Sequence, residues 1–156
     1  MSKRKKYTPQ PFESVGGNNL SSNIYITMLQ HPNFIALSNG AKVLYLHMKA
    51  QYYGAKIIDH PNTHFYFNWA LYSKTYKLGT NKAQFEKYRN ELIKYGFIEL
   101  VEYGGYSKTK NIYAYSDKWQ TGTTFDIPQD LIQPDEKRNI TRKTQSTKKK
   151  TAVTKM

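Results

Sequence analysis

Cysteine is absent from the 156-residue chain, which excludes disulfides and zinc sites built from thiolates. The simplest location for such a chain is inside the cell, so we expect a cytoplasmic protein. The sequence also lacks an apolar run of the roughly 18 residues that a membrane-spanning helix needs, so we expect no membrane partner. No apolar segment follows the basic start of the chain, Met1 to Lys6, which argues against a secretory signal.

The motifs of several enzyme classes are missing as well. We find no phosphate-binding loop, no glycine-rich dinucleotide fingerprint and no Ser-His-Asp ordering. Tyrosine-based relaxase chemistry would need a histidine triad, and none is evident. His60 and His64 stand four residues apart beside Asp59, but in a loop-like segment rather than in an H-E-x-x-H helix. We therefore predict a protein that is not an enzyme and has no metal or cofactor.

Acidic residues are scarce at both ends of the chain. Residues 1–6 hold four Lys/Arg and residues 137–156 hold eight, without a single acid in either segment. Residues 7–136 hold twelve basic and eleven acidic residues, so the ends carry nearly all of the formal net charge of +13. Such segments are attracted to polyanions, and nucleic acid is the commonest polyanion available to a soluble protein. The alternative interpretation is a pair of solubilising tails.

Composition divides the chain into three parts. Residues 1–23 are rich in Pro, Gly, Asn and Ser and are expected to form a disordered N-terminal arm. Residues 24–119 are expected to fold as one domain, and residues 120–156 to form a flexible basic tail. Four apolar residues interrupt that tail, and the sequence leaves open whether they pack on the domain or on a partner: Phe125, Ile127, Leu131 and Ile132.

The hydrophobic period within the domain changes several times. A β-prone stretch at 24–26 comes first, and Ser38 then caps a helix expected over 39–52. A loop over 55–64 and a short strand at 65–67 precede a second helix, which is expected from Trp69 to about Leu78. Thr80 is predicted to cap a third helix whose apolar face is Phe85, Tyr88, Leu92 and Tyr95.

Gly96 is expected to end the third helix in the left-handed conformation. A hairpin follows it. Its strands are predicted at 97–103 and 111–115, and Gly104 and Gly105 mark the turn. The predicted fold class is thus α+β, with a three-helix core and a β-hairpin.

This order of elements resembles the winged helix-turn-helix domains of replication, conjugation and regulatory proteins from phages, plasmids and conjugative elements of Gram-positive bacteria. The resemblance covers residues 24–119. It is carried by F-I-A-L-S-N-G-A-K-V-L-Y at 34–45, W-A-L at 69–71, Y-K-L-G-T at 76–80, L-I-K-Y-G-F-I at 92–98 and Y-A-Y-S-D-K-W at 113–119. It implies duplex DNA binding at an origin of replication or transfer or at an operator. Mobile-element proteins such as a relaxase or a replication protein are the implied further partners.

The third helix would then be the recognition helix, which enters the major groove with its N-terminal residues. Its apolar stripe leaves Ala83, Lys87, Asn90 and Lys94 on the opposite face. Asn and Gln side chains can read adenine, while Lys can read guanine or bind phosphate. The predicted DNA contacts on this helix are Thr80, Asn81, Lys82, Gln84, Lys87, Asn90 and Lys94.

The hairpin turn would be the wing that lies on phosphates or in the minor groove. Lys108 and Lys110, with Tyr106 beside them, are its predicted contacts. The alternative for the helix and the hairpin is an ordinary solvated surface. We expect Lys82, Gln84, Lys87, Lys108 and Lys110 to form one continuous DNA-contacting surface.

Two other functions stay open. The first is a protein-interaction adaptor that keeps the winged-helix scaffold and holds DNA loosely through its tails, because a fold does not by itself confer a function. The second is binding of RNA or single strands, for which the fourteen tyrosines would supply stacking platforms. Tyr45, Tyr88 and Tyr113 fall at core periods, however, so we expect them to be buried. The sequence leaves the oligomeric state, monomer or dimer, undecided.

Overall fold

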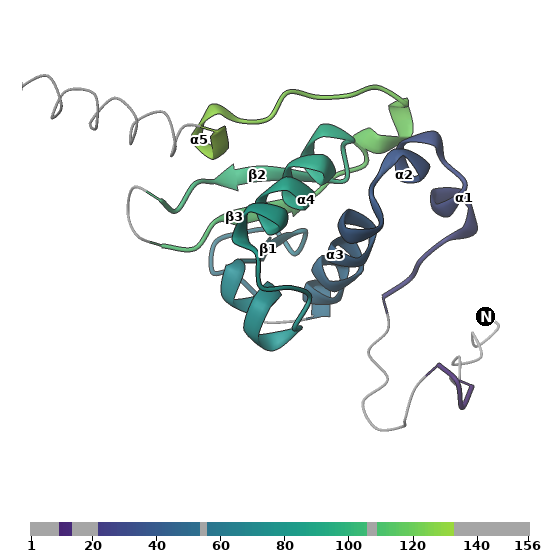
Figure 1. Cartoon of the computed structure of the whole chain (residues 1–156), viewed down its shortest axis with the longest axis horizontal. Helices are drawn as coiled ribbons and strands as arrows, with labels where there is room; N and C mark the ends of the chain where they lie inside the picture. The colour runs from purple at the N-terminus through teal and green to yellow at the C-terminus, as the bar shows by residue number, and fades with distance from the viewer. Residues whose placement is uncertain (1–9, 14–21, 54–55, 106–108, 133–156) are drawn as a thin grey trace, which may run out of the picture.

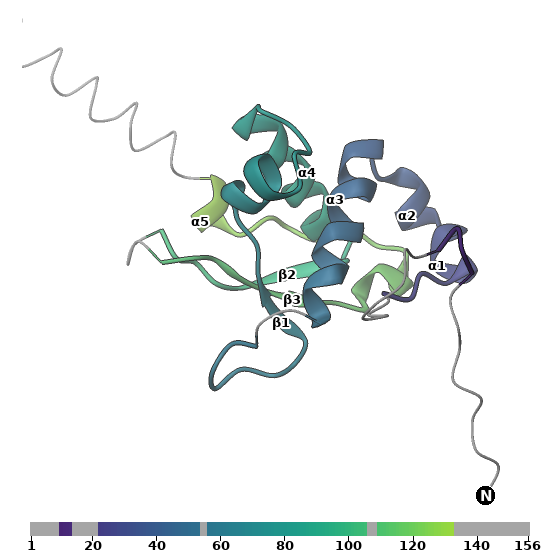
Figure 2. The ribbon, with the colours of Figure 1, turned by 90° about the horizontal axis from the view of Figure 1, so that it is seen from below.

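Two helices of the chain lie on one face of a small antiparallel sheet (Figures 1 and 2). The computed structural model describes residues 10–13, 22–53, 56–105 and 109–132. Its elements are α1 (Ile26–Leu29), α2 (Pro32–Ala36), α3 (Asn39–Ala50), η1 (Gln51–Tyr53), β1 (His64–Tyr66), η2 (Leu71–Thr75), α4 (Lys82–Lys94), β2 (Ile98–Glu102), β3 (Ile112–Tyr115), η3 (Lys118–Thr121) and α5 (Gln129–Ile132). This mixed α+β arrangement is compatible with a winged-helix fold.

Helix α3 begins where the sequence predicts it. The Ser38 side chain accepts a hydrogen bond from the Ala41 N–H at 3.3 Å, which satisfies one of the free donors of the first turn. Ala41, Leu44, Tyr45 and Met48 are buried at helical spacing. The start of the domain differs from expectation, because the β-prone residues 24–26 form no strand and Ile26–Leu29 form the short helix α1.

The second predicted helix, expected from Trp69 to about Leu78, is shorter than expected and is π-helical. Residues Leu71–Thr75 form a π-helical turn, in which the Tyr76 N–H donates to the Leu71 carbonyl at 2.9 Å. The Asn68 side chain accepts from the Leu71 N–H at its start. Lys77, with a φ of 51°, ends it in the left-handed region. The turn thus places Tyr72 in the core and leads directly into α4.

Helix α4 begins one residue later than predicted. Asn81, rather than Thr80, is the N-cap, because its side-chain oxygen accepts from the Ala83 and Gln84 N–H groups at 2.9 and 3.4 Å. Phe85 and Leu92 are buried, as the period predicts, whereas Tyr88, which was expected to be buried, is half-buried, as is Tyr95. Gly96, with a φ of 79°, ends the helix as expected. The Phe97 N–H donates to the Leu92 carbonyl at 2.9 Å and completes a Schellman motif.

The sheet has the strand order β1-β3-β2, so the last strand lies in the centre. Both pairings are antiparallel, and Tyr113 of β3 faces Phe65 on one side and Leu100 on the other. A bulge between Leu100 and Glu102 precedes the turn of the hairpin. The three predicted strands are therefore present, each with slightly different ends.

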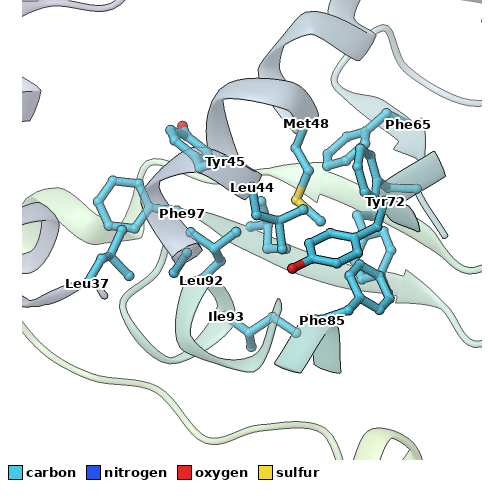
Figure 3. Packing of buried hydrophobic residues seen from close by; sticks show 14 of the residues in the cluster. Leu37, Leu44, Tyr45, Met48, Phe65, Tyr72, Phe85, Leu92, Ile93 and Phe97 are labelled. Carbon is cyan, nitrogen blue, oxygen red and sulfur yellow. The ribbon is translucent and has the colours of Figure 1, made fainter. Parts of the chain in front are cut away.

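The core lies between α3, α4 and the sheet (Figure 3). Leu44 and Met48 from α3 meet Leu92 from α4 and Phe97 before β2, and all four have relative exposures of 0 %. Tyr45 and Tyr113 are buried here, as expected from their core periods. Among the described residues, no helix is both long enough and apolar enough to cross a membrane.

The end of the described chain is packed on the domain, although the sequence suggested a flexible tail from residue 120. The apolar patch left unassigned by the sequence lies here: Leu131 is 8 % exposed within the core cluster, and Ile127 packs against that cluster. The Phe125 N–H donates to the Lys94 carbonyl at 2.8 Å. We call residues 123–132 the C-terminal strap.

Candidate nucleic-acid interface

Helix α4 presents three stripes of side chains to different surroundings. Gln84, Tyr88 and Glu91 lie on the side of α3, where the Glu91 carboxylate accepts from the Ser38 N–H at 2.9 Å. Lys82 and Arg89 face the β2–β3 hairpin across a groove. The stripe between these two sides consists of Ala83, Lys87, Asn90 and Lys94. Each stripe therefore offers different chemistry to a ligand.

The groove between α4 and the hairpin has a volume of about 570 Å³. Three cationic side chains, Lys82, Arg89 and Lys110, and two carboxylates, Glu86 and Asp130, line it. Asn68 and Asn111 add amides, and Trp69 and Tyr103 add aromatic surface. Cations, amides and aromatic rings are the groups that proteins use on phosphates and bases.

The two lysines of the groove are loosely held. The ammonium of Lys82 lies 4.0 Å from the Glu86 carboxylate, and both side chains are largely exposed. The ammonium of Lys110 lies 5.6 Å from the centre of the Tyr66 ring, which is a weak cation–π contact at an exposed site. Exposed pairs of this kind stabilise a fold by about 1 kcal/mol at most. Neither contact therefore holds its ammonium group strongly.

Arg89 is a cation of this groove that was not predicted from the sequence. It is only 6 % exposed, and its Nε and Nη2 atoms donate to the Asn90 side-chain oxygen at 3.1 and 3.0 Å. Its guanidinium lies 6.0 Å from the Phe85 ring, in cation–π range. Burial raises the pKa of the neighbouring Tyr113, and the positive charge of Arg89 opposes that shift. The available signal was its spacing, because position 89 falls between Phe85 and Leu92 on the apolar stripe.

The face of α4 that was expected to be free is partly covered. Lys87, Asn90 and Lys94 line a second hollow of about 470 Å³ together with Ile127, Leu131 and other strap residues. Lys87 and Lys94 remain exposed, whereas Asn90 is half-buried. The strap thus lies along the stripe that the sequence assigns to solvent or DNA.

The other predicted contacts are distributed unevenly. Of the five residues expected to form one surface, Lys82 and Lys110 line the α4–hairpin groove, whereas Lys87 lines the second hollow. Gln84 is exposed but lines neither hollow, because it precedes Tyr88 by one turn on the side of α3. Thr80 is exposed, and the side-chain oxygen of Asn81 is engaged in the helix cap. Tyr106 and Lys108 lie outside the described residues.

His60 and His64 contact each other. Their Nδ1 atoms are 3.0 Å apart, and the Nε2 atom of His60 lies 3.4 Å from the Glu102 carboxylate. The contact between His60 and Glu102 joins the loop before β1 to the end of β2. Within the described ranges, no group of three or more His, Asp or Glu side chains could hold a metal ion.

Comparison of the chain with models of known protein families, with curated proteins and with solved structures finds no match in any of the three.

Proposed function

We propose that the protein binds duplex DNA without catalysing a reaction, with α4 as the recognition helix and the β2–β3 hairpin as the wing. The observation that carries this proposal is that Lys82 of α4 and Lys110 of the hairpin line the same groove. A helix beside a hairpin, with cations on both, is the arrangement by which winged-helix proteins touch a groove and the adjoining phosphates.

The strand order and the charge distribution agree with this proposal. Strand β1 precedes η2 and α4 in the chain, and the hairpin strands follow, so the wing emerges beside the recognition helix. Eight Lys/Arg after residue 136 and four before residue 7 would add phosphate contacts that do not depend on sequence. An origin of replication or transfer, or an operator, remains the site that the resemblance to mobile-element proteins implies.

The test is binding of the full chain to duplex DNA over a range of salt concentrations. We expect Lys82→Ala and Lys110→Ala each to weaken binding to all sequences alike, because phosphates carry no sequence information. Each lost phosphate contact should lower the slope of log affinity against log salt by about 0.9. Lys56→Ala is the matched control, because Lys56 is exposed in the loop before β1 and contacts Tyr52.

Gln84 tests sequence reading separately. Gln84→Ala should reduce the preference for a selected site over random DNA by about 1–3 kcal/mol if the amide contacts a base. If the lysine variants and Lys56→Ala bind with the same affinity and the same salt slope, duplex binding by this surface is refuted. DNA would then be held by the tails alone, which is the behaviour expected of a protein-interaction adaptor.

A further inference from the structure

The C-terminal strap leaves the sheet at η3 and runs back along α4. Figures 1 and 2 show α5, at its end, beside α4 and the β2–β3 hairpin. Asp130, Leu131 and Ile132 of this turn line the α4–hairpin groove together with Lys82 and Lys110. The chain therefore places its own segment in the groove that we assign to DNA.

Backbone hydrogen bonds and apolar anchors hold different parts of the strap. Its backbone bonds to the domain are at its beginning, where the Thr123 carbonyl accepts from the Asn33 side chain at 2.9 Å and the Phe125 N–H donates to the Lys94 carbonyl. Beyond Phe125 the apolar anchors are Ile127 and Leu131. The described part of helix α5 is Gln129–Ile132, of which Leu131 is the buried residue. Leu131, at 8 % exposure, is therefore the most deeply buried apolar anchor of the distal half of the strap.

The Asp130 carboxylate of α5 would also compete with DNA phosphates for the cations of the groove. Asp130 brings a carboxylate into a groove that holds Lys82, Arg89 and Lys110. A phosphate and a carboxylate seek the same cationic donors. Leu131 and Ile132, in contrast, give a DNA backbone nothing to bind.

We propose that the C-terminal strap is an intramolecular cover of the α4–hairpin groove, and that duplex DNA displaces its distal half on binding. This inference rests on the proposed function. The protein then exists as a closed form and an open form, and its apparent affinity for DNA equals the affinity of the open form multiplied by the open fraction.

The first test releases the strap. Leu131→Ser removes its buried anchor in the full chain, and Ile58→Ser is the matched control, because Ile58 is 86 % exposed. We expect Leu131→Ser to tighten duplex binding by about tenfold, since burial of one leucine side chain sets the closed population. Ile58→Ser should bind like the parent protein. The thermal unfolding of both variants shows whether the domain remains folded.

The second test locks the strap, and it does not depend on a destabilising change. The chain has no cysteine, so Ala83→Cys with Ile132→Cys introduces the only two thiols, and both positions line the two hollows beside α4. A reducible bifunctional maleimide would join them. We expect the linked protein to bind duplex DNA at least about tenfold more weakly, and reduction of the linker in the same sample to restore binding.

The outcomes separate the inference from the proposed function. Tighter binding by Leu131→Ser with reversible loss in the linked protein supports the cover. Unchanged binding in both experiments, or weaker binding by Leu131→Ser in a folded protein, overturns it, because the strap would then be irrelevant or part of the interface. If binding is also insensitive to Lys82→Ala and Lys110→Ala, the proposed function fails, and the inference fails with it.

Discussion

Gly40 of α3 faces the Tyr88 ring of α4, and a side chain at position 40 would collide with that ring. A Cβ atom on Gly40 would lie 2.2, 2.4 and 2.7 Å from three atoms at the far end of the Tyr88 ring. Gly40→Ala should gain about 0.5–1 kcal/mol from better helix propensity. It should lose about 1–3 kcal/mol from overpacking, because the half-buried ring must move. The midpoints of these ranges give a net loss of about 1 kcal/mol, which would lower Tm by roughly 4–8 °C for a domain of this size.

The same substitution should have the opposite sign once the ring is gone. Tyr88→Leu removes all three colliding ring atoms and keeps an apolar side chain. In that background, Gly40→Ala should stabilise the domain by about 0.5–1 kcal/mol, because only the helix-propensity gain remains. Thermal and denaturant unfolding of the parent, both single variants and the double variant measures this coupling. An equal effect of Gly40→Ala in the two backgrounds would mean that α3 and α4 do not meet at this point.

Three further predictions concern the core and its titration. Leu92→Ala should lower the free energy of unfolding by about 2–5 kcal/mol, because Leu92 has a relative exposure of 0 %, whereas Lys94→Ala on the same helix should change it by less than about 0.5 kcal/mol; denaturant unfolding compares the two. Gly96→Val should cost more than Gly122→Val. Gly96 and Gly122 both have positive φ, 79° and 71°, but of the two only a Cβ atom at Gly96 would meet other atoms, 2.6 Å from the Trp119 backbone nitrogen. Equal Tm values for the two variants would therefore contradict the packing of η3 against Gly96. Burial raises the pKa of Tyr45 from 10.0 to about 12, so its contribution to stability should be intact below pH 10 and lost as the pH rises toward about 12. The free energy of unfolding, measured across this range, should therefore fall less steeply with pH for Tyr45→Phe than for the parent protein. Parallel curves for the two proteins would refute this assignment.

Periodicity alone predicted the parts of the fold that are held by regular burial. The spacing of apolar residues placed α3 and α4, and Gly96 marked the end of α4, because only a residue tolerant of positive φ suits that position. The first and last residues of a helix were harder to predict where neighbouring residues have similar capping ability. Thr80 and Asn81 are both good caps, and the choice between them depends on the turn that leads out of η2, which is set by tertiary packing.

The candidate site was less accessible to sequence reasoning than the fold. The stripe of α4 opposite its apolar face is exposed only if no other segment of the chain covers it. The helical period of α4 carries no information about which residues far away in the sequence pack on it. The apolar patch at 125–132 required a partner surface, but its composition could not distinguish α4 from another protein. Arg89 was overlooked because a buried arginine depends on partners such as Asn90 and Phe85, whose contacts appear only when the helix is packed.

If the protein binds duplex DNA as proposed, the position of Ile132 has a consequence for the order of events. Ile132 lines the α4–hairpin groove, and the sequence beyond it carries eight Lys/Arg between residues 137 and 156. DNA captured by that segment would be tethered within a few residues of the groove, at a high effective concentration. Capture would then depend on ionic strength, whereas the subsequent docking step would depend on how readily Leu131 leaves its site. The two steps should therefore respond to different variables: salt should govern the association rate, and substitutions at Leu131 should govern the rate of the slower rearrangement.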